Sequence, residues 1–306
     1  MNSYLFVNIF LLMTLITQQS WSAACCGGAG AMPALITGDE KSVASSTLIQ
    51  TDVQASVSSS GIWRKENRSN QTQTVRLDYA HIFADRFQVG ISLPMTQRRV
   101  ESENTNTSSG VGDLNLQIGY EYLTDWDYSS WRPRGVGYFA VSIPSGLSKY
   151  ETLEQSEIRG KGFYSAAVGT VLTKSWIKWD VLAGLELRRG FAREFNSNVY
   201  SGEVTPQWGK TLTVGLGYHI GSFRSGAMLS WNDEDSKKNK VRGIPSEFSA
   251  NEGSERFATG TVSLTYNANT DWSGSLSYSD QAIFGNPVNT TLAQTWAFSI
   301  QRRWQR

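Results

Sequence analysis

Residues 176–188 read WIKWDVLAGLELR, and the alternation within this stretch decides the fold class. One face of an extended strand would hold the apolar side chains Ile177, Trp179, Val181, Ala183, Leu185 and Leu187. The opposite face would hold Lys178, Asp180, Gly184, Glu186 and Arg188, with Leu182 as the exception. Successive side chains of a β-strand point to opposite faces, so this strand separates an apolar face from a charged one.

The same alternation recurs along most of the chain, which predicts an all-β fold. It is clear at 75–79, 87–98, 113–122, 208–220, 261–266, 272–279 and 296–300. No helical period of 3.6 residues is sustained after residue 25. No apolar run there approaches the roughly 18 residues that a membrane helix needs.

The connections between these strands alternate in length. Short ones are expected near 83–86, 173–176, 220–223 and 268–271, with a slightly longer one at 124–134. Longer polar stretches lie between them, at 65–71, 101–110, 145–160, 190–206, 233–255 and 285–291. This pattern predicts about twelve antiparallel strands, with both chain ends on the short-turn side.

A transmembrane β-barrel explains this pattern better than a secreted β-sandwich, which also alternates. The strands are long enough to cross a bilayer at a tilt, and aromatic residues, 12% of the chain, gather toward strand ends. The mean hydropathy of −0.33 excludes only membrane helices, because half of each barrel strand faces a polar lumen. We therefore predict a barrel over 46–306, with short periplasmic turns and long extracellular loops.

The N-terminal residues are expected to direct export. The apolar run 4–16 is too short to span a bilayer as a helix, and small residues at 22–24 fit a cleavage site. We predict a signal peptide at 1–24 and location in the outer membrane of a Gram-negative bacterium. Residues 25–45 are expected to be a flexible segment and a candidate plug of the barrel. An apolar N-terminal helix of a soluble domain is the alternative for the leader.

Two adjacent cysteines, Cys25 and Cys26, follow the expected cleavage site. The preceding Ser-Ala-Ala resembles a bacterial lipobox, which makes Cys25 a candidate for lipidation. The alternatives are a metal or redox role for the pair, and a thiol pair of unknown role. No metal site or cofactor is expected, because no other cysteine and no nearby histidine completes one.

The alternation also predicts which charged side chains point into the lumen. The candidates are Arg76, Asp78, Arg98, Asp113, Glu121, Lys178, Asp180, Glu186 and Arg188. Positive and negative candidates nearly balance, so we expect weak ion selectivity. The alternative role for each of them is an ion pair that stiffens the barrel.

Three stretches resemble a known family: 79–94 (YAHIFADRFQVGISLP), 110–122 (GVGDLNLQIGYEY) and 142–146 (SIPSG). They resemble the phenol-degradation meta-pathway outer-membrane family, which is related to the long-chain fatty-acid transporters. The matching positions are Asp85, Arg86, Leu93, Pro94, Gly110, Gly112, Asp113, Leu114, Pro144 and Gly146. The resemblance implies a transporter-like barrel for hydrophobic or aromatic small molecules.

The predicted function is therefore a channel or transporter for small solutes, and the alternative is a structural or adhesion barrel acting through its surface loops. An enzyme is not expected, because neither histidine, His81 or His219, stands in a nucleophile motif. The expected partners are outer-membrane lipid, lipopolysaccharide and an unidentified small solute, and nucleic acid is not among them. The barrel-insertion machinery is expected to recognise the last strand through Trp296, Phe298, Ile300 and Trp304.

Overall fold

The computed structural model describes residues 34–66, 69–101, 105–125, 129–197, 200–241, 248–283 and 285–305. The expected signal peptide and Cys25 lie outside these residues. Among the described residues, no helix is long and apolar enough to cross a membrane.

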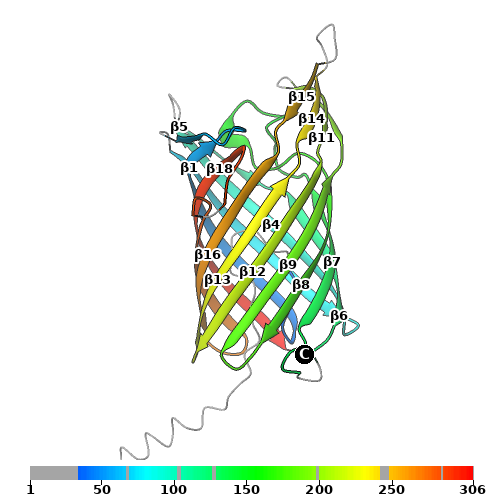
Figure 1. Cartoon of the computed structure of the whole chain (residues 1–306), viewed down its shortest axis with the longest axis vertical. Coiled ribbons are helices and arrows are strands. Elements are labelled where there is room, and N and C mark those ends of the chain that lie inside the picture. The colour runs from blue at the N-terminus through cyan, green and yellow to red at the C-terminus, as the bar shows by residue number, and fades with distance from the viewer. Residues whose placement is uncertain are drawn as a thin grey trace, which may run out of the picture.

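Twelve strands of the described chain close into one antiparallel barrel, as the sequence predicts (Figure 1). They are β1 (Glu40–Val57), β3 (Asn70–Phe83), β4 (Phe87–Glu101), β6 (Leu114–Leu123), β7 (Arg134–Ile143), β8 (Ser165–Ser175), β9 (Trp179–Gly190), β12 (Trp208–Ile220), β13 (Phe223–Glu234), β16 (Glu255–Asn267), β17 (Trp272–Asp280) and β18 (Thr290–Gln305). Each strand pairs with its neighbours in the chain order given, and β18 closes the barrel on β1.

Shorter elements extend the wall at the long-loop end (Figure 1). A small sheet runs in the order β10 (Arg193–Asn196), β11 (Ser201–Thr205), β14 (Lys237–Val241) and β15 (Phe248–Glu252). Strand β2 (Trp63–Lys65) pairs with β1, and β5 (Thr105–Val111) pairs with β4. A 3-10 turn, η1 (Gln155–Glu157), lies in the loop between β7 and β8.

The first strand starts earlier than the sequence predicts. Glu40 pairs with Gln305, so the barrel wall begins before the expected boundary at residue 46. The reason is that Glu40 and Ser42 are buried polar residues, and the stretch 40–45 shows no clear apolar face. Sequence alternation therefore could not detect this part of the strand.

The barrel wall is apolar outside and polar inside, the inverse of a soluble sandwich. Outward side chains such as Leu185, Leu212 and Phe298 are 46–49% exposed. On the inner face, Thr213 and Ser277 are almost fully buried. Only a surrounding lipid phase stabilises such a wall, because exposed apolar side chains on every strand would be unfavourable in water.

The short turns all lie at one end, where the described chain also begins its first strand and ends its last. The turn between β3 and β4 uses two residues with positive φ, Ala84 at 49° and Asp85 at 61°, a geometry that suits a tight hairpin. Between β8 and β9 the turn covers 176–178, slightly later than the predicted 173–176. In outer-membrane barrels the short-turn end faces the periplasm.

Aromatic side chains form a girdle at the short-turn end. Outward rings from neighbouring strands lie in contact, with centroid separations of 4.5 Å for Trp179–Tyr218, 4.8 Å for Phe87–Tyr120 and 5.0 Å for Phe223–Tyr266. Such rings stabilise the wall at the membrane interface, where amphipathic aromatic residues are favoured.

Candidate functional site: the barrel lumen

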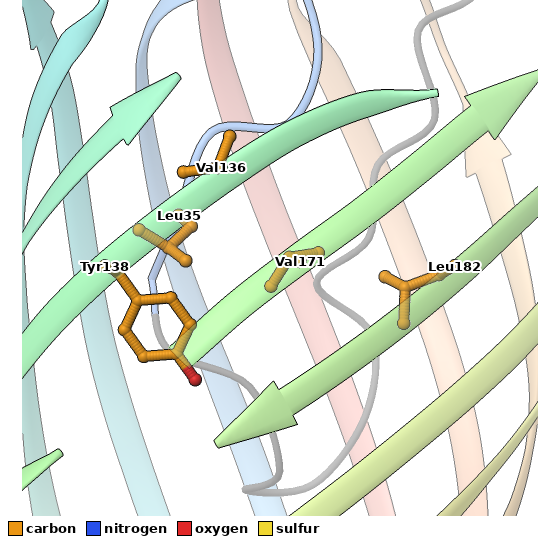
Figure 2. Packing of buried hydrophobic residues seen from close by; sticks show 5 residues of the cluster. All are labelled: Leu35, Val136, Tyr138, Val171 and Leu182. Atoms are coloured by element: carbon orange, nitrogen blue, oxygen red, sulfur yellow. The ribbon is translucent and has the colours of Figure 1, made fainter. Parts of the chain in front are cut away.

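Residues 34–39 lie inside the barrel, in the half nearer the short turns. Leu35 is 5% exposed and packs against side chains that three neighbouring strands point inward (Figure 2). These side chains are Val136 and Tyr138 of β7, Val171 of β8 and Leu182 of β9. Ile36 packs separately against Ala80 and Ile82 of β3. The lumen thus holds two apolar contact areas for this segment.

Two lumenal glutamines bind the backbone of the segment. The Ile36 N–H donates to Gln88 Oε1 at 2.7 Å, and Gln88 Nε2 donates back to the Ile36 carbonyl at 3.1 Å. Gln117 Nε2 donates to the Ala34 carbonyl at 2.6 Å. These amides satisfy backbone groups that would otherwise be buried without partners, as a neighbouring strand would do.

An arginine anchors the segment where it joins β1. The Arg134 guanidinium donates to the Gly38 carbonyl at 2.5 Å and contacts the Asp39 carboxylate at 3.0 Å. Glu121, which is 3% exposed, holds the same guanidinium through both carboxylate oxygens, each at 2.9 Å. This ion pair, with one hydrogen bond from a terminal guanidinium nitrogen, holds Arg134 while its other terminal nitrogen donates to the segment.

Two glycines on neighbouring strands make room for the segment. A Cβ at Gly90 of β4 would lie 2.5 Å from the Ala34 carbonyl oxygen and closer still to Gln117 Nε2. A Cβ at Gly119 of β6 would lie 3.2 Å from a Leu35 methyl carbon. Larger residues at either position would displace the segment, the glutamines or both.

Charged groups on β9 and the strands near it are paired with one another. Tyr138 donates through its hydroxyl to Glu186 Oε2 at 2.9 Å, and Arg188 contacts Glu186 Oε1 at 2.9 Å. Arg188 also contacts Glu234 at 3.5 Å. Nearer the short turns, the Asp180 carboxylate accepts from Arg224 at 2.6 and 2.8 Å and contacts His219 Nε2 at 2.8 Å.

The lumen wall on β3 and β4 shows the same pairing. Arg76 Nε contacts Asp78 Oδ2 at 2.9 Å, and Ser45 donates to the same carboxylate. Arg98 Nε donates to Asn70 Oδ1 at 3.1 Å. Because most lumenal charges have a partner of opposite sign or a neutral acceptor, the lining presents no uniform ring of one charge.

The loop between β7 and β8 folds across the long-loop mouth. On one side of the mouth, the backbone N–H of the loop residue Lys161 donates to Asp113 Oδ2 at 2.7 Å. On the other side, the Lys161 ammonium contacts Glu234 Oε1, at the end of β13, at 2.6 Å. Asp113 directly precedes β6, and four strands of the wall, β7, β8, β9 and β12, lie between β6 and β13. Beside Glu234 lies a polar pocket of about 380 Å³, lined by Lys149, Glu234, Asp235, Lys237, Gly253, Glu255 and Asn289.

The motifs that carry the family resemblance meet at the foot of this loop. Asp113 accepts from the Gly146 N–H at 3.2 Å, and Ser145 donates to the Gly112 carbonyl at 2.6 Å. A Cβ at Gly112 would lie 3.0 Å from the Pro94 ring. Burial raises the pKa of the Asp113 carboxyl, while the N–H groups of Lys161 and Gly146 act in the opposite direction. The contacts of these motif residues give them a structural role, because they hold the loop between β7 and β8 in place.

The structure places eight of the nine predicted lumenal residues on the inner wall or at its mouth and corrects the ninth. Lys178 lies in the turn before β9 and is exposed, because the strand begins only at Trp179. Sequence alternation puts Gln88 and Gln117 on polar strand faces but does not link them to residues 34–39, and it missed Arg134 and Tyr138. The one available signal was Leu182, whose apolar side chain breaks the alternation because it faces Leu35 in the lumen.

Comparison with solved structures identifies the fold. An outer membrane channel from Pseudomonas putida F1 matches with a TM-score of 0.69 and 11% identity, covering 90% of this chain and 99% of that chain. A deletion mutant of the monoaromatic hydrocarbon channel TodX matches with 0.49 and 11%, covering 90% and 93%. The translocator domain of the autotransporter NalP from Neisseria meningitidis matches with 0.43 and 10%, covering 86% and 88%.

No protein-family model matches the chain, and no curated protein matches it. At 11% identity the Pseudomonas putida structure shows the fold alone. The chain therefore has the fold of a transmembrane antiparallel β-barrel, as the sequence predicts.

Proposed function

We propose that the protein is an outer-membrane channel for small solutes whose passage is narrowed by its own N-terminal segment. The observation that carries the proposal is the seating of residues 34–39 in the lumen on Gln88, Gln117 and Arg134. A barrel of twelve strands falls between small barrels filled by side chains and large water-filled porins. The barrel of similar fold from Pseudomonas putida is a channel, which makes this the first hypothesis to test.

The contacts of the segment are suited to a plug that can rearrange. None of its residues 34–39 belongs to a strand, so few backbone hydrogen bonds would be lost if it moved. The segment is contacted by side-chain amides, one guanidinium and two small apolar areas. All of these groups belong to the barrel wall and would stay in place if the segment moved. A hydrogen bond of this kind contributes only about 1 kcal/mol net, so a solute or a partner could compete with it.

Small hydrophobic or aromatic molecules are the solute class that we propose. The family resemblance implies this class. The inward side chains Val136, Tyr138, Val171 and Leu182 support it, because they would line an apolar strip once Leu35 moves away. Such molecules could then bind this apolar strip on their way through an otherwise polar lumen, and would not have to cross the whole lumen in contact with water alone.

Single-channel conductance in planar bilayers tests the proposal. Replacing both lumenal glutamines, Gln88→Ala and Gln117→Ala, removes three hydrogen bonds to the segment and should raise the conductance or the open fraction. Gln97→Ala is the matched control, because Gln97 is exposed on the same strand as Gln88. No conductance in either protein, and no solute uptake into vesicles, would reject a channel.

A structural or adhesion barrel is the second candidate, favoured by one observation. The sheet of β10, β11, β14 and β15 stands beyond the barrel rim and is ordered around the buried side chains Phe195 and Val204. Deleting 198–204 and 238–250 together should abolish surface binding if adhesion is the function. A channel would keep its conductance in that variant. Neither candidate function involves catalysis.

A further inference from the structure

The outer face of the wall carries a basic patch at the long-loop end, formed by Arg189, Trp208 and Lys210. Arg189 lies opposite Trp208 in the register of β9 and β12, while Lys210 lies opposite Leu187. All these side chains point outward, so Arg189 and Lys210 are diagonal neighbours on one face. Such neighbours lie about 7–8 Å apart, so two long side chains at these positions can contact the same ligand group.

The patch lies where the apolar outer surface ends. Leu187 and Leu212, each two residues further along its strand toward the membrane centre, are 38% and 46% exposed on the same face. Trp231 of β13, opposite Leu212 in the register, is also exposed. Aromatic residues and the first cations beyond an apolar band mark the level of lipid headgroups.

Neither cation of the patch has an acidic partner within the described parts of the chain. Arg189 donates to the neutral Gln207 Oε1 at 3.1 Å, and its guanidinium lies 5.4 Å from the centre of the Trp208 ring. Two acids stand beside the patch without an ion pair to either cation. Asp233 lies opposite Lys210 in the register but contacts Arg256 at 3.4 Å, and the exposed Asp235 donates its backbone N–H to the Trp208 carbonyl at 2.8 Å. This part of the rim therefore holds three cations, Arg189, Lys210 and Arg256, against two acids, and only Arg256 is engaged in an ion pair there.

We propose that this patch binds the phosphate group of an anionic glycolipid in the outer leaflet. The planar guanidinium of Arg189 is held by Gln207 and Trp208, which leaves N–H groups available for a phosphate oxygen. Lys210 would supply a second charge to the same group. A lipid is favoured over free phosphate because the apolar strip of Leu187 and Leu212 continues directly from the patch, where acyl chains would lie.

The opposite rim provides a matched control. Arg302 also points outward at the end of a strand, and its guanidinium lies 4.9 Å from the Trp304 ring and 5.4 Å from the Trp272 ring. It has the same chemistry as Arg189 and lies at the short-turn end. Its opposite neighbours in the register, Ala44 and Trp272, and its diagonal neighbours Ser42 and Ser46 are uncharged, so none of them adds a second cation. The proposed surface lies outside the lumen, so its test is independent of the channel proposal.

The experiment measures binding of bis-phosphorylated lipid A to the full mature protein in detergent by native mass spectrometry. Arg189→Gln with Lys210→Gln should weaken binding about tenfold, since each basic residue near an anionic headgroup contributes to binding. Arg302→Gln should bind as the parent does. A dephosphorylated lipid A should bind the parent as weakly as phosphorylated lipid A binds the double variant, and millimolar inorganic phosphate should not displace the lipid.

Three results would overturn the proposal. They are unchanged binding by the double variant, an equal loss in Arg302→Gln, and full displacement by inorganic phosphate, which would indicate a simple anion site. Heat-modifiable gel mobility establishes that each variant is folded. If the double variant does not fold, Lys210→Gln alone decides, because Lys210 is exposed and its replacement should still weaken binding severalfold. Unchanged affinity in that variant would equally overturn the proposal.

Discussion

At the residue scale, Gly90 makes the position of the N-terminal segment testable. Alanine there would place a Cβ 2.5 Å from the Ala34 carbonyl oxygen and closer still to Gln117 Nε2, so the hydrogen bond that joins the two must be disturbed. We expect Gly90→Ala to raise conductance and to increase protease cleavage of the segment. Gly215→Ala is the control, because a Cβ at this lumenal position meets its nearest atoms at 3.6 Å, an ordinary contact. Equal behaviour of the two variants would argue against a seated segment.

Asp180 is the residue on which the stability of the periplasmic half should depend most. It is 2% exposed and holds Arg224 and His219, so Asp180→Asn leaves a buried guanidinium without its carboxylate. We expect a loss of about 3 kcal/mol in the free energy of unfolding. Asp233→Asn, at a pair with Arg256 whose side chains are 41% and 61% exposed, should cost less than about 1 kcal/mol. Urea unfolding in lipid vesicles compares them, and similar costs would refute this ranking.

At the scale of elements, the last strand carries the prediction about barrel insertion. Trp296, Phe298, Ile300 and Trp304 all point outward on β18, between 38% and 52% exposed. We expect Phe298→Ala with Trp304→Ala to slow insertion by the cellular machinery while leaving spontaneous folding into micelles nearly unchanged. Phe223→Ala is a matched control, since Phe223 has the same 49% exposure as Phe298 but lies on β13. A similar delay in that control would mean that outward aromatic surface in general is sensed.

The elements that alternation could predict are those with one apolar and one polar face. The alternation at 176–188 predicts strand β9, which runs from Trp179 to Gly190, and the order of long and short connections follows from turn and loop composition. The first residues of β1 were missed because Glu40 and Ser42 obey no apolar pattern. Lumen contacts such as Gln117 with Ala34 join residues 83 positions apart, and no periodicity in one strand specifies them.

At the scale of the whole molecule, the paired lumen charges predict weak ion selectivity. Arg188 lies between Glu186 and Glu234, and Arg76 lies beside Asp78, so their fields largely cancel. We expect a reversal potential close to zero in a potassium chloride gradient, measured at low ionic strength where screening is weakest. Glu186→Gln with Glu234→Gln should shift it toward anion selectivity, because Arg188 and Lys161 then lose their partners. Lys178→Gln should cause no shift, since Lys178 lies in an exposed turn outside the lumen. If Lys178→Gln shifted the reversal potential as much as the two glutamate replacements do, the lumenal charges would not be what sets the ion selectivity.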